Sequence, residues 1–161
     1  VEAYGTVDEA NAFLGRARTS CLDTPAAAMA PLLADLQAEL FVVGAELATV
    51  PAKIESLKKS MPLLADDAPT SLEKLIDDAE EGLAPMKHFV LAGGTSASAD
   101  LHLARCVVRR AERLVVALAE QESVRPALLV YLNRLSDLLF TLARRANHLA
   151  GVDDVPWKPR G

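Results

Sequence analysis

The chain has 161 residues, a length typical of one domain, and 51% of them are hydrophobic, which is enough to build a core. The formal net charge of −5 argues against general affinity for nucleic acid, which requires a basic surface. Only 4% of the residues are aromatic and runs of β-branched residues are few, so we expect packed helices rather than sheets.

Helical periodicity and end signals predict the first two helices. The first covers about Glu2–Thr19, although Thr6 and Glu9 also match a capping box from which it could begin instead. Thr24–Pro25 is expected to cap the second helix, because proline is favoured in a first helical turn. The second helix presents leucines and valines at helical spacing and ends before Pro51.

Prolines separate the second helix from the third. Residues 51–69 contain three prolines and are expected to be irregular, apart from a short helix at Lys53–Lys59. The third helix reads SLEKLIDDAEEGL and is expected to start at Thr70 or Ser71 and to stop near Pro85.

A connection with the sequence HFVLAGGTSASAD joins the third helix to the fourth. The adjacent glycines Gly93–Gly94 permit a sharp reversal of the chain. Thr95, Ser96 or Ser98 can then cap the fourth helix, which includes Leu101–Glu120.

The fifth helix is expected to open at Pro126 and to close at Gly151, and the tail VDDVPWKPRG that follows is not expected to be helical. No repeat, low-complexity tract or domain boundary is recognisable. Short links between long helices favour an all-α, ferritin-like up-and-down bundle of five helices that forms a single domain over residues 1–161.

Cysteine usage and hydropathy indicate the compartment. Cys21 and Cys106 are too few for a disulfide framework, and no CxxC or Cys/His cluster indicates zinc. Charged residues interrupt every long apolar stretch before the eighteen or so residues that span a membrane, and no signal peptide is recognisable. We therefore expect a cytoplasmic protein without a membrane partner.

The fourth helix, LHLARCVVRRAERLVVALAE, carries the most informative pattern in the chain. At helical spacing its polar and apolar residues separate onto two faces. The polar face holds His102, Arg105, Arg109, Glu112 and Arg113. The apolar side holds Leu101, Ala104, Val107, Val108, Ala111, Leu114, Val115 and Leu118.

Two interpretations of this polar face remain open. Guanidinium groups are planar, permanently charged forks that suit phosphate and carboxylate, and a chain of negative net charge that gathers four arginines in one helix is expected to bind something anionic. The alternative is an ordinary solvated face on which Glu112 serves as an ion-pair partner.

Two further polar groups are candidates for binding. In the last helix Asn133, Asp137, Thr141 and Arg144 follow one another at helical spacing, and the Asn133 amide suits the recognition of a ribose or a base. The alternative is a set of surface pairs, in which Asp137 holds an arginine. Asp8 in the first helix is a candidate partner for a guanidinium of the fourth helix or of a neighbouring chain, or a simple helix-start acid.

The sequence lacks the residues that two classes of enzyme require. A di-iron bundle needs Glu-x-x-His pairs, and no ExxH occurs in the sequence. Nucleophilic triad chemistry needs a Ser or Cys with a nearby His, whereas His88, His102 and His148 are isolated. We identify no side chains that bind a metal.

Three blocks of the sequence closely resemble the signature blocks of the PduO-type ATP:cob(I)alamin adenosyltransferases. They are EAYGTVDEAN, FVLAGGTSASADLHLARCVVRRAER and YLNRLSDLLFTLARRAN. The resemblance extends from Val1 to about Trp157 and implies a cobalamin adenosyltransferase-like five-helix bundle that assembles as a homotrimer, with ATP and the corrinoid bound at the subunit interfaces.

The resemblance also implies the reaction. Cob(I)alamin attacks the ribose C5′ of ATP and yields adenosylcobalamin and triphosphate, so the protein needs no nucleophile of its own. Its tasks are to position ATP, to neutralise the leaving triphosphate with arginines and Mg²⁺, and to make the cobalt of bound cob(II)alamin reducible. A reductase and an adenosylcobalamin-dependent mutase are the further partners expected.

Site residues follow from the matched positions. The RRAER block implies an ATP site that includes Arg109, Arg110, Ala111, Glu112, Arg113 and, from YLNRLSD, Asn133. Arg105 is expected to form a salt bridge with Asp8 across the subunit interface. Phe89 corresponds to the aromatic residue on the lower corrin face, where its bulk excludes the lower axial ligand of cob(II)alamin; a core phenylalanine is the alternative.

The sequence departs from the family pattern in two places. The family segment resembling TKTGDxGxT, which cradles the ATP phosphates, would precede Val1. The connection reads FVLAGG where the family usually has proline in place of Ala92, so we expect Phe89 to be held less firmly. The alternative functions are a non-catalytic sensor or carrier module that binds ATP or corrinoid, and a helical interaction scaffold.

Overall fold

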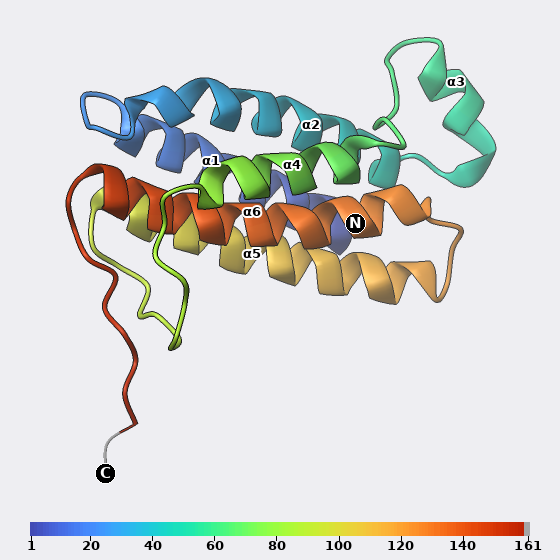
Figure 1. Ribbon diagram of the computed structural model, residues 1–161. Coiled ribbons are helices and arrows are strands. Elements are labelled where there is room, and N and C mark those ends of the chain that lie inside the picture. The colour runs from blue at the N-terminus through green and yellow to red at the C-terminus, as the bar shows by residue number, and fades with distance from the viewer. Residues whose placement is uncertain (160–161) are drawn as a thin grey trace.

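The computed structural model describes residues 1–159, and Arg160 and Gly161, the end of the predicted tail and domain, lie outside the described residues. Over this range the chain forms six α-helices, two short 3-10 turns and a single isolated β-bridge (Figure 1). The helices are α1 (Glu2–Cys21), α2 (Ala30–Ala48), α3 (Ile54–Lys58), α4 (Ala68–Glu80), α5 (Ser96–Ala119) and α6 (Pro126–Leu149), and the turns are η1 (Ala27–Met29) and η2 (Pro51–Lys53).

The five long helices α1, α2, α4, α5 and α6 pack into one bundle. The short α3 lies outside this bundle at one end (Figure 1). Along the chain the long helices alternate in direction. In space α1 packs between α2 and α5, and α6 packs between α5 and α4. The predicted all-α, five-helix up-and-down bundle is therefore confirmed, and the short helix expected at Lys53–Lys59 is found as η2 followed by α3.

The core is aliphatic and draws on every long helix. The predicted apolar arc of α6 is buried, and so are the central residues of the predicted apolar side of α5, since helical spacing places them on one face. The largest fully buried leucines are Leu14, Leu33, Leu36, Leu40, Leu72, Leu101, Leu128, Leu132, Leu135, Leu138 and Leu139. Burial of these side chains supplies most of the driving force for folding.

Two predicted helix starts are wrong. Thr24 does not cap α2: its Oγ1 donates to the carbonyl of Cys21 (2.6 Å) and accepts from the amide of Ala26 (3.1 Å), which closes the turn after α1. The third helix, α4, begins at Ala68, two residues before the predicted start, because Pro69 sits in its first turn, where proline costs no hydrogen bond.

Other end signals act as predicted. Thr95 is the residue that caps α5, and its Oγ1 accepts from the amide of Ser98 at 3.2 Å. Gly151, which follows the C-cap residue Ala150 of α6, adopts a φ of +67°, a conformation that favours glycine. The capping box at Thr6 and Glu9 is not used, because α1 already begins at Glu2.

The stretch Ala27–Ala48, which comprises η1 and α2, is long and apolar enough to cross a membrane by length and composition alone. In the bundle the inner face of α2 belongs to the core. A core helix of a globular protein can be as long and as apolar as a membrane-spanning helix. On its outer side the large apolar side chain of Phe41 is exposed, whereas Leu32, Val42 and Leu47 are partly buried against the core.

Candidate active site

An open groove of about 730 Å³ lies between α4 and α5, with residues of α6 along its floor. We call it the α4–α5 groove. It brings together three residues that the sequence singled out from separate blocks: Phe89, Arg105 and Arg109. The other residues that line it are Glu73, Ile76, Asp77, Glu80, Met86, Arg134, Ser136, Asp137, Phe140 and Thr141.

The α5 wall of this groove carries positive charge that is not neutralised within the described part of the chain. Arg105 forms no ion pair there, and its guanidinium carbon lies 5.9 Å from the centre of the Phe140 ring, a cation–π arrangement. Its Nε is buried without a hydrogen-bond partner. Arg109 is exposed and likewise has no carboxylate partner among residues 1–159. Two guanidiniums in this state favour an anionic ligand.

The opposite wall is acidic. Arg134 Nε donates to Glu73 across the groove at 2.8 Å, and Arg134 Nη1 lies 3.4 Å from Asp137 on its own helix. The ion pair of Arg134 with Asp137 matches the surface-pair alternative for this carboxylate. These pairs occupy Arg134, so Arg105 and Arg109 are the arginines of the groove that are available to a ligand.

Glu112 and Asn133, both expected at the ATP site, contact one another across the seam between α5 and α6. The Asn133 amide nitrogen donates to Glu112 Oε1 at 2.9 Å, and the Asn133 amide oxygen accepts from Arg134 Nη1 at 3.0 Å. The pair is thus joined to the α4–α5 groove through Arg134, and the mutual hydrogen bond orients both side chains.

The remaining residues of the RRAER block point in different directions. Arg110 forms an ion pair with Glu9 of α1, on another side of α5 from the groove. The Ala111 side chain is fully buried and lets the helices pack closely in the core. Arg113 is exposed and has no carboxylate partner in the described range 1–159.

Asp8 does not meet Arg105 within one chain. It is exposed in a second, smaller groove of about 320 Å³ between α1 and α2, which we call the α1–α2 groove. That groove is largely apolar and includes Phe41, whose side chain is 71% exposed. Asp8 has no ion-pair partner in residues 1–159. The predicted salt bridge across a subunit interface stays a prediction.

Phe89 lies in the connection between α4 and α5 and is 77% exposed. The alternative of a core phenylalanine is therefore wrong. An exposed aromatic ring at the end of the α4–α5 groove costs hydrophobic free energy unless a ligand or partner covers it. The ring is therefore available to a ligand or to a partner protein.

His102 differs from its predicted place on the polar face of the fourth helix. It is buried at the seam of α5 and α6, where its ring lies edge-on to Phe140 at 5.8 Å and its Nδ1 has no hydrogen-bond partner. Burial lowers the pKa of the imidazole; Arg105 lowers it further, while Asp154 acts in the opposite direction. The prediction fails because α6 covers this part of the polar stripe, where the Phe140 ring packs against His102.

This buried histidine predicts acid sensitivity. Because the pKa of His102 is lower in the folded state than its ordinary value of about 6.5, the unfolded state binds its proton first as the pH falls. Its contribution is present above that value and is lost below it. The unfolding free energy should therefore fall more steeply below about pH 6.5 in the unmodified protein than in His102→Gln, as measured by urea denaturation. His148→Gln, at an exposed position, is the control; equal slopes for all three proteins would contradict the prediction.

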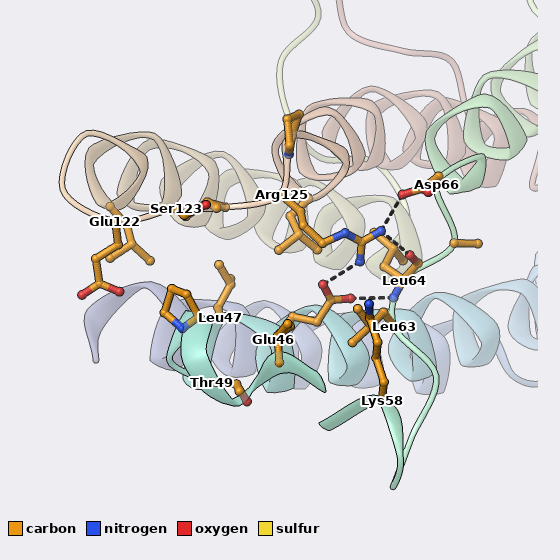
Figure 2. A pocket seen from close by; sticks show the side chains of 17 residues that line it. Glu46, Leu47, Thr49, Lys58, Leu63, Leu64, Asp66, Glu122, Ser123 and Arg125 are labelled. Carbon is orange, nitrogen blue, oxygen red and sulfur yellow. Dashed lines mark hydrogen bonds and ion pairs between the residues drawn. The ribbon is translucent and has the colours of Figure 1, made fainter. Parts of the chain in front are cut away.

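Apart from these two grooves, a cavity of about 750 Å³ lies at the end of the bundle near α3 (Figure 2). Its central charged groups, Glu46 and Arg125, are paired with each other. Glu46, almost fully buried, accepts from the amide of Leu64 (2.5 Å) and from Arg125 Nη1 (2.7 Å), and Arg125 Nη2 donates to the Leu64 carbonyl (2.9 Å) and to Asp66 (2.6 Å). Sequence patterns missed this cluster, because its members lie on segments far apart in the chain. It fastens residues 49–67 to the start of α6.

Breaking this cluster is expected to destabilise the bundle. Arg125→Met leaves the Glu46 carboxylate buried without its cation, which should lower the unfolding free energy by about 3 kcal/mol. The double variant Glu46→Met/Arg125→Met removes the charge as well and should recover most of that loss. Urea denaturation of both variants measures this; a double variant as unstable as the single one would contradict the interpretation.

No cluster of three or more His, Cys, Asp or Glu side chains suited to a metal ion occurs among residues 1–159. The described side chains therefore offer no built cage for Mg²⁺. A magnesium ion that arrives on nucleotide phosphates needs none, since such ions keep several waters and use substrate oxygens.

The described chain is an all-α bundle in which two available arginines and an exposed phenylalanine line one groove, an arrangement that suits an anionic, partly apolar ligand. The sequence profile described as cobalamin adenosyltransferase matches residues 1–146. The chain belongs to this family, and the resemblance found in the sequence blocks is confirmed.

Relatives and solved structures support the same assignment. The corrinoid adenosyltransferase of Mycobacterium tuberculosis is 44% identical over 163 residues, which cover 99% of this chain and 80% of that protein. The corrinoid adenosyltransferase of Bacillus subtilis is 38% identical over 159 residues, 98% of this chain and 79% of that protein. A solved structure of a phenylalanine-to-alanine variant of the PduO-type ATP:corrinoid adenosyltransferase from Lactobacillus reuteri, complexed with cobalamin and ATP, has a TM-score of 0.88 at 32% identity and covers 98% of this chain and 84% of that one.

Proposed function

We propose that this chain transfers the 5′-deoxyadenosyl group of ATP to cob(I)alamin, and that cob(II)alamin is reduced while bound to the protein. The observation that carries the proposal is the meeting of Phe89, Arg105 and Arg109 in the α4–α5 groove. The relatives, which cover nearly the whole chain and are named for this activity, support it.

The reaction needs positioning and charge rather than protein nucleophiles. The cobalt electron pair forms the cobalt–carbon bond at C5′, the C5′–oxygen bond breaks, and triphosphate leaves with that electron pair. We assign to Arg109 and Arg113 the neutralisation of the growing negative charge, and to Glu112 and Asn133, which hydrogen-bond to each other, the binding of the nucleoside. Mg²⁺ bound to the phosphates would add charge neutralisation.

The role proposed for Phe89 is to exclude an axial ligand. A bulky ring against the lower corrin face leaves no room for a fifth ligand on cob(II)alamin. Without that ligand the axial orbital of cobalt drops in energy and accepts an electron more easily. The exposure of Phe89 at the end of the α4–α5 groove supports this role.

We further propose a homotrimer with sites at the subunit interfaces. The α1–α2 groove carries Asp8 and the exposed Phe41, and the α4–α5 groove on another face carries Arg105. Two different faces of opposite charge on one chain favour head-to-tail contacts, which form a closed ring when the rotation between neighbours is one third of a turn. The incomplete burial of the apolar α2 helix supports the same contact.

A complementation experiment tests the shared site. Asp8→Ala and Arg105→Ala should each lose adenosyl transfer alone. Co-expressed in equal amounts, they should regain about one quarter of the unmodified activity, because random head-to-tail assembly rebuilds an intact Asp8–Arg105 pair at one interface in four. Activity of the mixture no higher than that of the single variants would contradict an interface between subunits.

The partners proposed are ATP, the corrinoid, a reductase that supplies the electron and a mutase that consumes adenosylcobalamin. The free thiols Cys21 and Cys106 fit a reducing cytoplasm. Residues 1–161 are proposed to act as one domain, of which the structure describes residues 1–159.

The direct test is incubation with MgATP and chemically reduced cob(I)alamin, with light-sensitive adenosylcobalamin as the expected product. A sensor or carrier module would bind ATP or corrinoid without forming it. An interaction scaffold would not bind ATP in a calorimetric titration.

A further inference from the structure

The segment after α6 pairs with the connection that carries Phe89. The amide of Trp157 donates to the carbonyl of Phe89 at 2.7 Å, and the amide of Leu91 donates to the carbonyl of Val155 at 2.8 Å. These bonds form an antiparallel bridge between Val90 and Pro156. Figure 1 shows the C-terminal segment running down from the bundle beside this connection.

The base of this C-terminal segment is fastened to α6 by a carboxylate that is largely buried. Asp154 accepts from Arg144 Nε at 2.9 Å and from the Asn147 amide nitrogen at 3.3 Å. Only 11% of the Arg144 side chain is exposed, and its Nη2 donates to the carbonyl of Ala84 at 2.7 Å, in the chain that leaves α4. One ion pair thus links α6, the C-terminal segment and the start of the connection.

Asn147 links the other end of the same connection to α6. Its side-chain oxygen accepts from the amide of Thr95 at 2.9 Å, and its nitrogen donates to the carbonyl of Gly93 at 3.0 Å. Gly94 has a φ of +97°, and a Cβ there would collide with the Asn147 side chain. Only glycine permits this close approach.

The Phe89 ring itself has little support, because 77% of it is exposed. The connection has Ala92 rather than a proline that would stiffen it. The backbone bond from Trp157 to the Phe89 carbonyl therefore restrains where this ring lies.

We propose that residues 152–157 form a strap that positions Phe89 in the α4–α5 groove, with Asp154 as the positioning residue that anchors the strap to α6. This inference rests on the function proposed above, since the position of Phe89 matters to the reduction of bound cob(II)alamin. It assigns a role to the segment around Trp157, which the sequence blocks left unassigned.

The first test removes a single backbone donor. Trp157→Pro deletes the N–H that bonds the Phe89 carbonyl, while Trp157→Ala loses the indole and keeps that N–H. Trp157→Pro should lower transfer that starts from cob(II)alamin at least about 10-fold relative to Trp157→Ala, and should leave transfer from pre-reduced cob(I)alamin within about 2-fold.

The second test releases the anchor. Asp154→Ala removes the acceptor of Arg144 and Asn147, and Asp153→Ala changes a neighbouring carboxylate that is exposed. Asp154→Ala should show the same selective loss from cob(II)alamin, and Asp153→Ala should not. Asp154→Asn, which keeps the acceptor oxygen, should recover part of the loss. If Trp157→Pro fails to fold, the comparison of Asp154→Ala with Asp153→Ala still tests the strap.

A readout without corrinoid follows the strap itself. Hydrogen exchange at the amide of Leu91, which bonds Val155, should be faster in Trp157→Pro and Asp154→Ala than in their controls. Unchanged exchange, or an equal loss from both cobalamin states, would overturn the strap. If the unmodified protein forms no adenosylcobalamin, the proposed function fails, while Leu91 exchange still reports on the strap.

Discussion

Replacing Arg109 by alanine is expected to lower adenosyl transfer to pre-reduced cob(I)alamin by at least about 100-fold, because a guanidinium that neutralises the leaving triphosphate acts mainly in the transition state. The side chain is exposed at the α4–α5 groove and has no ion-pair partner within residues 1–159. Its loss should therefore change the unfolding free energy by no more than about 0.5 kcal/mol. Steady-state kinetics and urea denaturation measure the two quantities.

A matched control is Arg18→Ala, which removes an exposed arginine of α1 outside both grooves. It should leave transfer unchanged. Arg109→Lys keeps the charge and loses the planar fork, so it should fall between the unmodified protein and the alanine variant. Unchanged turnover of Arg109→Ala would refute the proposed role.

Phe89→Ala is expected to separate the two halves of the reaction. With pre-reduced cob(I)alamin the rate should stay within about 3-fold, because the ring is not needed for attack on C5′. When cob(II)alamin must be reduced on the protein, the rate should fall by at least about 100-fold, since an axial ligand returns and the cobalt becomes harder to reduce. The electron paramagnetic resonance spectrum of bound cob(II)alamin should change from a four-coordinate to a five-coordinate form.

Leu91→Ala is the control for Phe89, because it shortens an exposed side chain of the same connection and keeps the amide that bonds Val155. It should behave like the unmodified protein in both assays. An equal loss for Phe89→Ala from both cobalamin states would count against the role in excluding the axial ligand.

The architecture was largely predictable, because burial in a bundle follows helical periodicity. The faces of α5 and α6 lie as expected, and Thr95 and Gly151 act at the predicted ends. The error at Thr24 arises because Pro25 lies in the turn before η1, and the proline in the first turn of α2 is Pro31. The error at the start of α4 arises because Pro69, expected in the irregular stretch, lies in the first helical turn.

The site was predictable in its residue types but not in its contacts. The sequence blocks implied Phe89, Arg105 and Arg109, yet their meeting in one groove depends on how the connection folds back over α5 and α6. Arg110 meets Glu9, 101 residues away along the chain, and no local pattern indicates that pair.

Buried polar groups were the least predictable. His102 was predicted on a polar face and Asn147 carried no prediction, but neighbouring segments cover both. Asn147 joins two chain segments at once, and such long-range hydrogen bonds appear only when the tertiary structure is known.

The central claim is that ATP is broken at C5′ by cobalt within this bundle. The measurement that tests it most directly is the ratio of triphosphate to adenosylcobalamin formed from MgATP and cob(I)alamin by the purified protein. We expect one triphosphate for each adenosylcobalamin, and none of either product without the protein. Release of phosphate or diphosphate in place of triphosphate, or ATP and corrinoid binding without adenosylcobalamin, would contradict the account.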